Sequence, residues 1–229
     1  GLGVMREALK PENRRPFQWR RANPFGAFRK MAEMPQLVRL LIVLFVFNLA
    51  FAVYPSVWAY YTEAQFDFST WESGVTLGAF GISSAIVQGG LIRFIIPRLG
   101  EHWTVIYGMS LQVATFVGYV FIPYGWMIYL LLPLAALGGV AGPALAGIMS
   151  RSVGDDQQGE LQGVNASIAA VSMTIAPLVL TQAFTYFTGP NAPFNLPGAP
   201  FALSAILLAF ALVVFLGRRR LGGVALENK

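Results

Sequence analysis

The chain of 229 residues contains no cysteine and a single histidine, His102. Without cysteine the protein has neither a disulfide framework nor a thiol-ligated metal site. A lone histidine at the edge of a predicted loop is far more often a solvated side chain than a ligand. Charged residues are scarce as well, at 12% of the chain, whereas a soluble domain has about 25%. The sequence therefore predicts no metal site and no cofactor.

Charge is absent altogether from four windows, residues 40–62, 73–92, 103–150 and 161–217. A helix needs about 20 apolar residues to cross the bilayer core. The first two windows each fit one such helix. The last two each fit a pair, separated by Pro123-Tyr124-Gly125 and by the Pro-, Gly- and Asn-rich residues 188–200. We expect six spans, near 38–62, 74–96, 104–122, 126–149, 164–187 and 200–217.

These spans must be helical, because lipid offers no hydrogen-bond partners to an open backbone. Segments of about ten residues with alternating polarity, which mark a transmembrane barrel, do not occur. The predicted fold class is an all-α membrane protein with six transmembrane helices. Residues 1–35 are predicted to form a basic cytoplasmic linker, residues 36–220 the helical bundle, and residues 221–229 a cytoplasmic tail.

The basic residues are placed on one side of these spans. A net charge of +5 is compatible with nucleic-acid binding, but basic residues also mark cytoplasmic loops. The three other loops contain no Lys or Arg and carry Glu63, Asp67 and Glu72 or no charge. We therefore expect an even number of spans, both termini in the cytoplasm, the lipid bilayer as partner and no nucleic acid. The 16 basic residues are Arg6, Lys10, Arg14, Arg15, Arg20, Arg21, Arg29, Lys30, Arg39, Arg93, Arg98, Arg151, Arg218, Arg219, Arg220 and Lys229.

Small residues and prolines recur inside the spans. Three glycine pairs spaced by four residues predict close helix packing: Gly74 and Gly78, Gly138 and Gly142, Gly159 and Gly163. Proline bends a helix. Kinked, glycine-rich helices suit a protein that rocks between conformations, although many static bundles have them too. The prolines within spans are Pro55, Pro133, Pro143 and Pro177.

Uncharged polar residues are the candidates for a substrate cavity, because nothing ionisable lies deep in a span. Proton relays normally use intramembrane Asp, Glu, His or Arg. A buried amide must pair with another helix or face a water-filled cavity, and both alternatives stand. Aromatic residues 47, 51, 54 and 58 provide stacking surfaces for a flat ligand or, alternatively, a lipid-facing stripe. The cavity candidates are Asn48, Tyr54, Trp58, Ser84, Gln88, Gln112 and Asn165.

Several segments resemble, in order, the tetracycline/proton antiporters of the major facilitator superfamily. PALAGIMS (143–150) followed by DDQQGELQG (155–163) is similar to the end of their tenth helix and the loop after it. YPSVW (54–58) with YTE (61–63) looks like their seventh helix, and RLGE (98–101) looks like the loop between helices eight and nine. QG (88–89) and APL (176–178) also fit.

The resemblance implies that the chain is the C-terminal six-helix half of a transporter. The implied partners are the N-terminal half, a small-molecule substrate and protons, and the implied site is the bacterial inner membrane. The implied activity is export of a planar drug in exchange for a proton. Ser84 and Gln112 stand where this family has a titratable His and Asp, so proton coupling is expected to rest on the other half.

The cytoplasmic loops supply a second group of candidates, for a gate. Carboxylates at the start of the fifth span complement a helix N-terminus, and Arg151 is expected to pair with Asp155, Asp156 or Glu160. Simple capping and solvation is the alternative. The gate candidates are Arg98, Glu101, Arg151, Asp155, Asp156, Gln158, Gly159, Glu160 and Gln162.

Three functions follow as hypotheses. The first is proton-coupled efflux of tetracycline-like or other amphiphilic drugs by alternating access. The second is a metabolite facilitator or importer on the same fold. The third is a non-transporting orphan half that acts as a membrane scaffold. An enzyme is the least expected, because no His/Asp/Glu constellation lies in or beside the spans.

Overall fold

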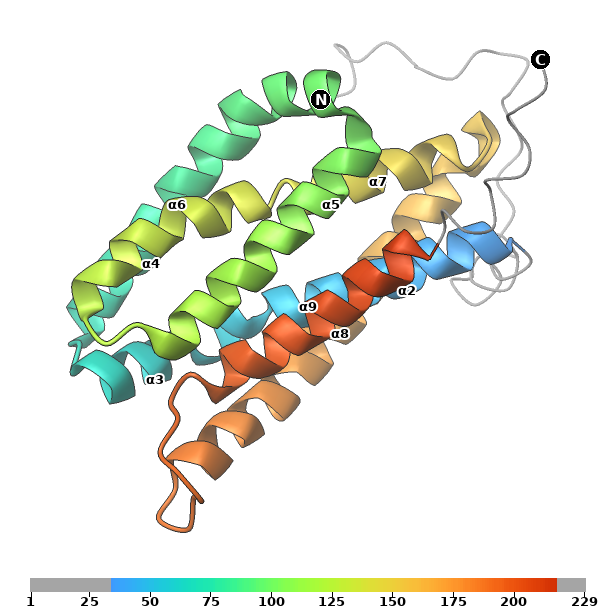
Figure 1. Cartoon of the computed structure of the whole chain (residues 1–229). Coiled ribbons are helices and arrows are strands. Elements are labelled where there is room, and N and C mark those ends of the chain that lie inside the picture. The colour runs from blue at the N-terminus through green and yellow to red at the C-terminus, as the bar shows by residue number, and fades with distance from the viewer. Residues whose placement is uncertain (1–33, 218–229) are drawn as a thin grey trace, which may run out of the picture.

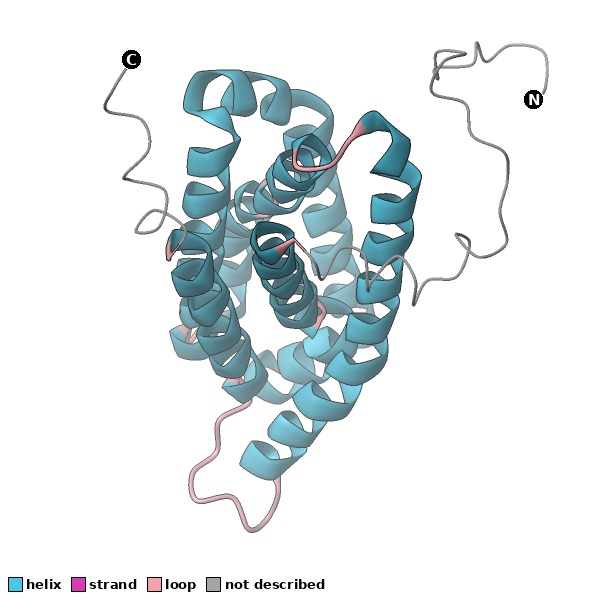
Figure 2. Cartoon of the chain, turned by 90° about the vertical axis from the view of Figure 1, so that its right-hand side faces the viewer, coloured by secondary structure: helices cyan, strands magenta, loops and turns pink. Residues whose placement is uncertain are grey.

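The computed structural model describes residues 34–217, and this part of the chain is helical with no strand (Figures 1 and 2). The predicted all-α class is confirmed. The predicted linker 1–35 and tail 221–229 fall outside the described residues, except for Met34 and Pro35. The helices are α2 (Pro35–Phe51), α3 (Val53–Phe66), α4 (Thr70–Ile86), the π-helix η2 (Val87–Leu91), α5 (Ile92–Phe121), α6 (Ile128–Gly138), α7 (Ala141–Arg151), α8 (Gln158–Thr188) and α9 (Ala199–Leu216).

Two predicted spans are each made of two shorter helices. The first is divided at Ala52 into α2 and α3, three residues before Pro55. Proline has no N–H to donate to the carbonyl one turn earlier, which here belongs to Phe51. The fourth is divided at Gly139 and Val140 into α6 and α7, just before Pro143. Pro55 and Pro143 thus mark these interruptions, whereas Pro133 and Pro177 lie inside α6 and α8, which continue past them.

Five helical stretches are long and apolar enough to cross a membrane. One of them, Thr70–Phe121, has 52 residues, which would span about 78 Å if straight, against about 30 Å for a bilayer core. It is not straight, because Gly100 has φ 74° and ψ 157°, and the chain turns back there (Figure 1). We call residues 70–99 the first leg and 101–121 the second leg. The count of six crossings stays a prediction, which this turn supports.

The second leg of α5 lies at the centre of the bundle and packs against α6, α7 and α9, while α2 packs against α8 and α9. An aromatic cluster fills the core between them. The Phe201 ring lies 4.7 Å from that of Tyr61 and 5.0 Å from that of Tyr119, measured between centroids. Its other members are Tyr54, Trp58 and Phe116.

The tightest helix crossing joins the second leg to α6 and α7. A Cβ on Gly108 would lie 2.8 Å from the Gly138 carbonyl oxygen and 2.9 Å from the Ala141 nitrogen, so only glycine fits there. Of the predicted glycine pairs, Gly138 makes such a contact. By contrast, both members of the pairs on α4 and α8 have no other group within 4 Å of a built Cβ.

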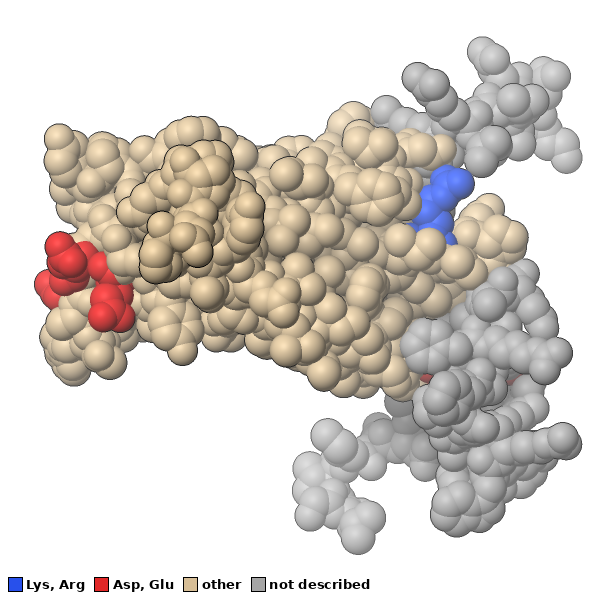
Figure 3. Space-filling model, turned by 90° about the horizontal axis from the view of Figure 1, so that it is seen from below, with Lys and Arg blue, Asp and Glu red and all other residues tan. Residues whose placement is uncertain are grey.

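Charge is confined to the ends of the described bundle. On the face drawn in Figure 3 the acidic residues gather at one end, the basic ones near the opposite end, and the surface between is uncharged. The loop before α4 carries Asp67, and Ser69 and Glu72 form a reciprocal capping box that begins this helix. A uniform uncharged middle with charged ends is what a bilayer requires.

Candidate substrate face and cytoplasmic charge network

The predicted cavity residues fall into two groups. Tyr54, Trp58 and Gln112 are buried inside the bundle, with 4%, 2% and 0% of their surface exposed. The others lie nearer the surface: Gln88 is exposed, and Asn48, Ser84 and Asn165 are half-buried.

The buried group is held by hydrogen bonds between helices. Gln112 Nε2 on α5 donates to the Tyr54 hydroxyl on α3 at 3.0 Å, and Trp58 Nε1 donates to Thr76 Oγ1 on α4 at 2.9 Å. These contacts favour the helix-to-helix interpretation for all three residues over direct lining of a cavity. Thr76 was not among the residues predicted from the sequence. It stands three residues after Ser73, and both are buried on the same side of α4.

Gln112 also contacts α6 closely. A Cβ on Gly138 would lie 2.5 Å from Gln112 Oε1, so the side chain lies directly against the α6 backbone. Among the described residues this oxygen has no hydrogen-bond donor. The Gln112 amide nitrogen is thus hydrogen-bonded, whereas within the described residues its oxygen is not. Buried polar atoms without a partner are rare in native structures.

The surface of the first leg is divided into distinct faces around α4. Its core side carries Ser73, Thr76 and Val87. At 100° per residue, Ser84 and Gln88 form a polar flank next to this side. A face of exposed small residues follows, and then an apolar flank. The small face is Gly74, Gly78, Gly81, Ala85 and Gly89, and the apolar flank is Val75, Ile82 and Ile86.

A second small-residue face lies on α8. Its members follow one another at intervals of four, three, four and four residues, which are the intervals found on α4. All are exposed, and the two glycines have open space beyond their Cα atoms. Both helices therefore present flat, unpartnered surfaces within the described residues. The members on α8 are Gly159, Gly163, Ala166, Ala170 and Thr174.

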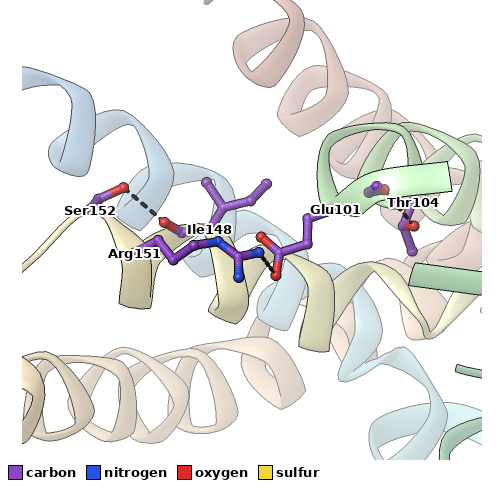
Figure 4. A network of polar contacts seen from close by, with 6 residues as sticks. Glu101, Thr104, Ile148, Arg151 and Ser152 are labelled. Carbon is purple, nitrogen blue, oxygen red and sulfur yellow. Dashed lines mark hydrogen bonds and ion pairs between the residues drawn. The ribbon is translucent and has the colours of Figure 1, made fainter. Parts of the chain in front are cut away.

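Arg151 at the end of α7 forms an ion pair with Glu101, at the start of the second leg (Figure 4). The structure thus gives Arg151 a different partner from the acidic residues 155, 156 and 160 expected from the sequence. The Glu101 side chain is only 14% exposed, against 70% for Arg151. A helix N-terminus stabilises an anion and a C-terminus a cation, so each charge lies at the favourable end of its helix.

Both members of this ion pair belong to the same helical bundle. The pair therefore braces two helix ends within the bundle rather than joining it to another. It lines a cavity of about 440 Å³ together with His102, Ile148 and Ser152. Gly147 makes room for it, because a Cβ there would collide with the Glu101 carboxylate.

Comparison of the sequence with known proteins shows the family of this chain. The model of the Major Facilitator Superfamily matches residues 4–177. The chain belongs to this superfamily. It is 34% identical over 172 residues, 75% of its length, to the tetracycline resistance protein, class C, of Escherichia coli. It is 36% identical over 152 residues, 66% of its length, to the class G protein of Vibrio anguillarum.

A further relative is less similar in sequence. The chain is 26% identical over 164 residues, 69% of its length, to the human hippocampus abundant transcript-like protein 1. The matched regions cover 43%, 39% and 32% of these three relatives, so the chain spans less than half the length of each. The resemblance seen in the sequence is confirmed, and the chain is part of an integral membrane protein.

Apart from Arg98, which lies on the first leg just before Gly100, the remaining gate candidates of this superfamily member lie around the start of α8. Gln158 Nε2 donates to the Ser150 carbonyl at 2.7 Å, and Ser150 Oγ donates to Gln158 Oε1 at 2.9 Å. This reciprocal pair joins the ends of α7 and α8. Glu160 lies in the first turn of α8, as expected for a carboxylate at a helix N-terminus. Asp155 and Asp156 form the preceding 3₁₀ turn, and Arg98, Gly159 and Gln162 are exposed.

Proposed function

We propose that this chain is the C-terminal half of a secondary transporter that exports tetracycline-like or other planar amphiphilic drugs by alternating access. The observation that carries the proposal is the polar flank of the first leg. Ser84 lies about 21 Å along the helix from Thr70 and about 24 Å from Gly100, near the middle of the leg, and Gln88 is exposed one turn further on. An amide exposed to hydrocarbon is costly, so this flank faces a water-filled pathway.

The second half of the transporter is the proposed partner. The chain covers less than half of its tetracycline resistance relatives, and superfamily transporters enclose their substrate between two six-helix halves. Small residues allow helices to approach closely in the membrane. We assign the small faces of α4 and α8 to contact with the absent half, which leaves the flank with Ser84 and Gln88 facing the space between the halves.

Proton coupling, in this proposal, resides in the other half. No Asp, Glu, Lys or Arg lies between Glu72 and Arg93, or between Glu101 and Arg151. Ser84 and Gln112 occupy the positions where the resemblance implies titratable residues, and neither side chain gains or loses a proton near neutral pH. The proposed location is the bacterial inner membrane, with both ends of the chain in the cytoplasm because the basic residues gather there.

The test is tetracycline uptake into inverted membrane vesicles that contain the complete protein to which this chain belongs. Uptake driven by an imposed proton gradient, and abolished by a protonophore, is the expected result. A panel of planar amphiphiles should be carried along with tetracycline. Absence of gradient-dependent uptake for every compound, in vesicles with confirmed protein, would overturn the proposal.

A facilitator that carries a metabolite without proton coupling is the second candidate. Ser84 and Gln112 favour it, because this half lacks the titratable groups of a coupled exporter. The same vesicles discriminate between the two. Substrate equilibration that is indifferent to the proton gradient would favour the facilitator. A stable protein with no transport of any kind would favour the scaffold hypothesis.

A further inference from the structure

We propose that Phe51, Phe80, Ser84 and Gln88 form a binding face for a planar, uncharged ring system that carries hydrogen-bonding groups along one edge. We call these four residues the Phe80 face. The inference rests on the proposed function, and it names the part of the pathway that recognises the substrate. It also replaces Tyr54 and Trp58, which the sequence suggested as stacking surfaces, because those rings are buried.

The aromatic part of the face consists of two half-buried rings from different helices. Phe51 ends α2 and Phe80 lies on α4, with 6.4 Å between their ring centroids and 42° between their planes. Both are packed on one side against the core and are incompletely covered on the other. Aromatic rings stack with such separations in offset or tilted geometries, so the open side of this pair offers a flat ligand a matching surface.

The buried Tyr54 ring supports Phe51 and Phe80 on their core side. It stacks on Phe80 at 4.9 Å and 22°, and meets the Phe51 ring edge-on at 5.3 Å. Gln112 holds the Tyr54 hydroxyl in turn. A binding surface that is ordered before the ligand arrives avoids the entropy cost of ordering it on binding. Tyr54 and Gln112 are therefore positioning residues that act through Phe80.

The polar part of the face continues from Phe80 along the same side of the helix. Ser84 and Gln88 follow at intervals of four residues, and such residues share a face. A glutamine amide offers two donors and two acceptors. Gln88 belongs to the π-helix η2, an element that occurs frequently at functional sites.

The chemistry of the face selects for an uncharged ring system. It contains no ionisable side chain, and the first charge along the helix is Arg93, whose guanidinium lies over the Phe94 ring at 5.0 Å from its centroid. A permanently cationic planar dye would find no carboxylate here to offset its loss of hydration. The expected ligand part is a neutral or internally neutralised fused ring with hydroxyl, carbonyl or carboxamide groups.

Equilibrium binding to the purified complete protein in detergent tests this inference, with tetracycline and ethidium as probes. Phe80→Leu is expected to raise the Kd for tetracycline about three- to ten-fold, and Gln88→Leu about five-fold. Phe80→Tyr should restore most of the affinity, and ethidium should bind weakly to every variant. The matched controls are Phe184→Leu, which removes a half-buried ring that contacts Tyr60, and Gln182→Leu, which removes an exposed amide on α8; neither should change tetracycline binding.

The outcomes separate this inference from the proposed function. Transport by the wild type with unchanged Kd in Phe80→Leu and Gln88→Leu overturns the Phe80 face and leaves the function standing. Tetracycline binding that depends on both residues without gradient-driven uptake supports the face and overturns the exporter. Equal losses in Phe184→Leu and Phe80→Leu would show a general effect on folding, and would contradict the assignment. Tight ethidium binding that depends on Phe80 would contradict the proposed neutral ligand.

Discussion

Gln112 donates a hydrogen bond to the Tyr54 hydroxyl across the interface between α5 and α3, and neither side chain reaches the surface. The two residues are 58 positions apart, so the bond joins the first and the third predicted spans inside the bundle. Its burial means that each partner depends on the other, because a buried polar group that loses its partner keeps the full cost of having left water. This coupling leads to a stability prediction.

Gln112→Leu is expected to lower the free energy of unfolding by about 1 kcal/mol, because the Tyr54 hydroxyl is left buried and unpaired. Tyr54→Phe should cost a similar amount by stranding the amide nitrogen. The double variant removes both polar partners and should be more stable than either single variant. Thermal unfolding of the purified protein in detergent measures all four forms. Simple additivity of the two losses would contradict the bond as a coupled unit.

Gly108→Ala is expected to destabilise the bundle by about 1–3 kcal/mol. The new Cβ would meet the α6 carbonyl and the α7 backbone, which are not flexible groups that can move aside. Gly90→Ala is the matched control, because no group lies within 4 Å of its Cβ, it lies outside the small face of α4, and alanine is the better helix former. Chemical cross-linking and thermal unfolding of both variants check this. Equal stability of the two variants would refute the close crossing.

The approximate positions of the helices were predictable from the sequence, but the side of each helix that is buried was not. Charge-free windows bound a span because charged groups avoid hydrocarbon. A helix that is apolar all round carries no periodic signal of which side is buried. On α4 the buried side is in fact polar, with Ser73 and Thr76, and the exposed sides are apolar or small. For the same reason, the sequence did not show that Tyr54, Trp58 and Gln112 are buried between helices.

Spacing between glycines was similarly ambiguous. The pairs on α4 and α8 share the four-residue interval of the pair that begins at Gly138, yet only Gly138 lies at a close crossing in the described bundle. Gly108, whose built Cβ makes the shortest contact with backbone atoms, has no glycine four residues away. Close approach is set by which helices are neighbours, and a local interval does not contain that information. The Glu101 ion pair was missed for the same reason, since its partner is 50 residues away.

Gly100→Ala is expected to lower the free energy of unfolding by about 1–3 kcal/mol, because φ 74° and ψ 157° is a conformation that essentially only glycine adopts. Gly100→Asn should be no better, since asparagine tolerates left-handed helical angles and not these. Gly90→Ala, on the same leg and with no group within 4 Å of its Cβ, is the control. Thermal unfolding in detergent is the measurement. A neutral Gly100→Ala would show that the first and second legs do not turn back at this residue.

Arg151→Gln is expected to destabilise this end of the bundle by about 1 kcal/mol, because it leaves the nearly buried Glu101 carboxylate without this cation. Exchanging the two charges, with Glu101→Arg and Arg151→Glu together, should not restore stability. Each charge would then lie at the unfavourable end of its helix.

Gly147→Ala provides the independent check on this ion pair. The added methyl group displaces the carboxylate, so this variant should lose about as much stability as Glu101→Gln. In a Glu101→Ala background the same substitution should have little effect, because nothing remains to be displaced, and the two losses should therefore not add. Thermal unfolding of the single and double variants decides the point. Additive losses would mean that Gly147 and Glu101 act separately, and that the charge pair does not hold α7 against the second leg.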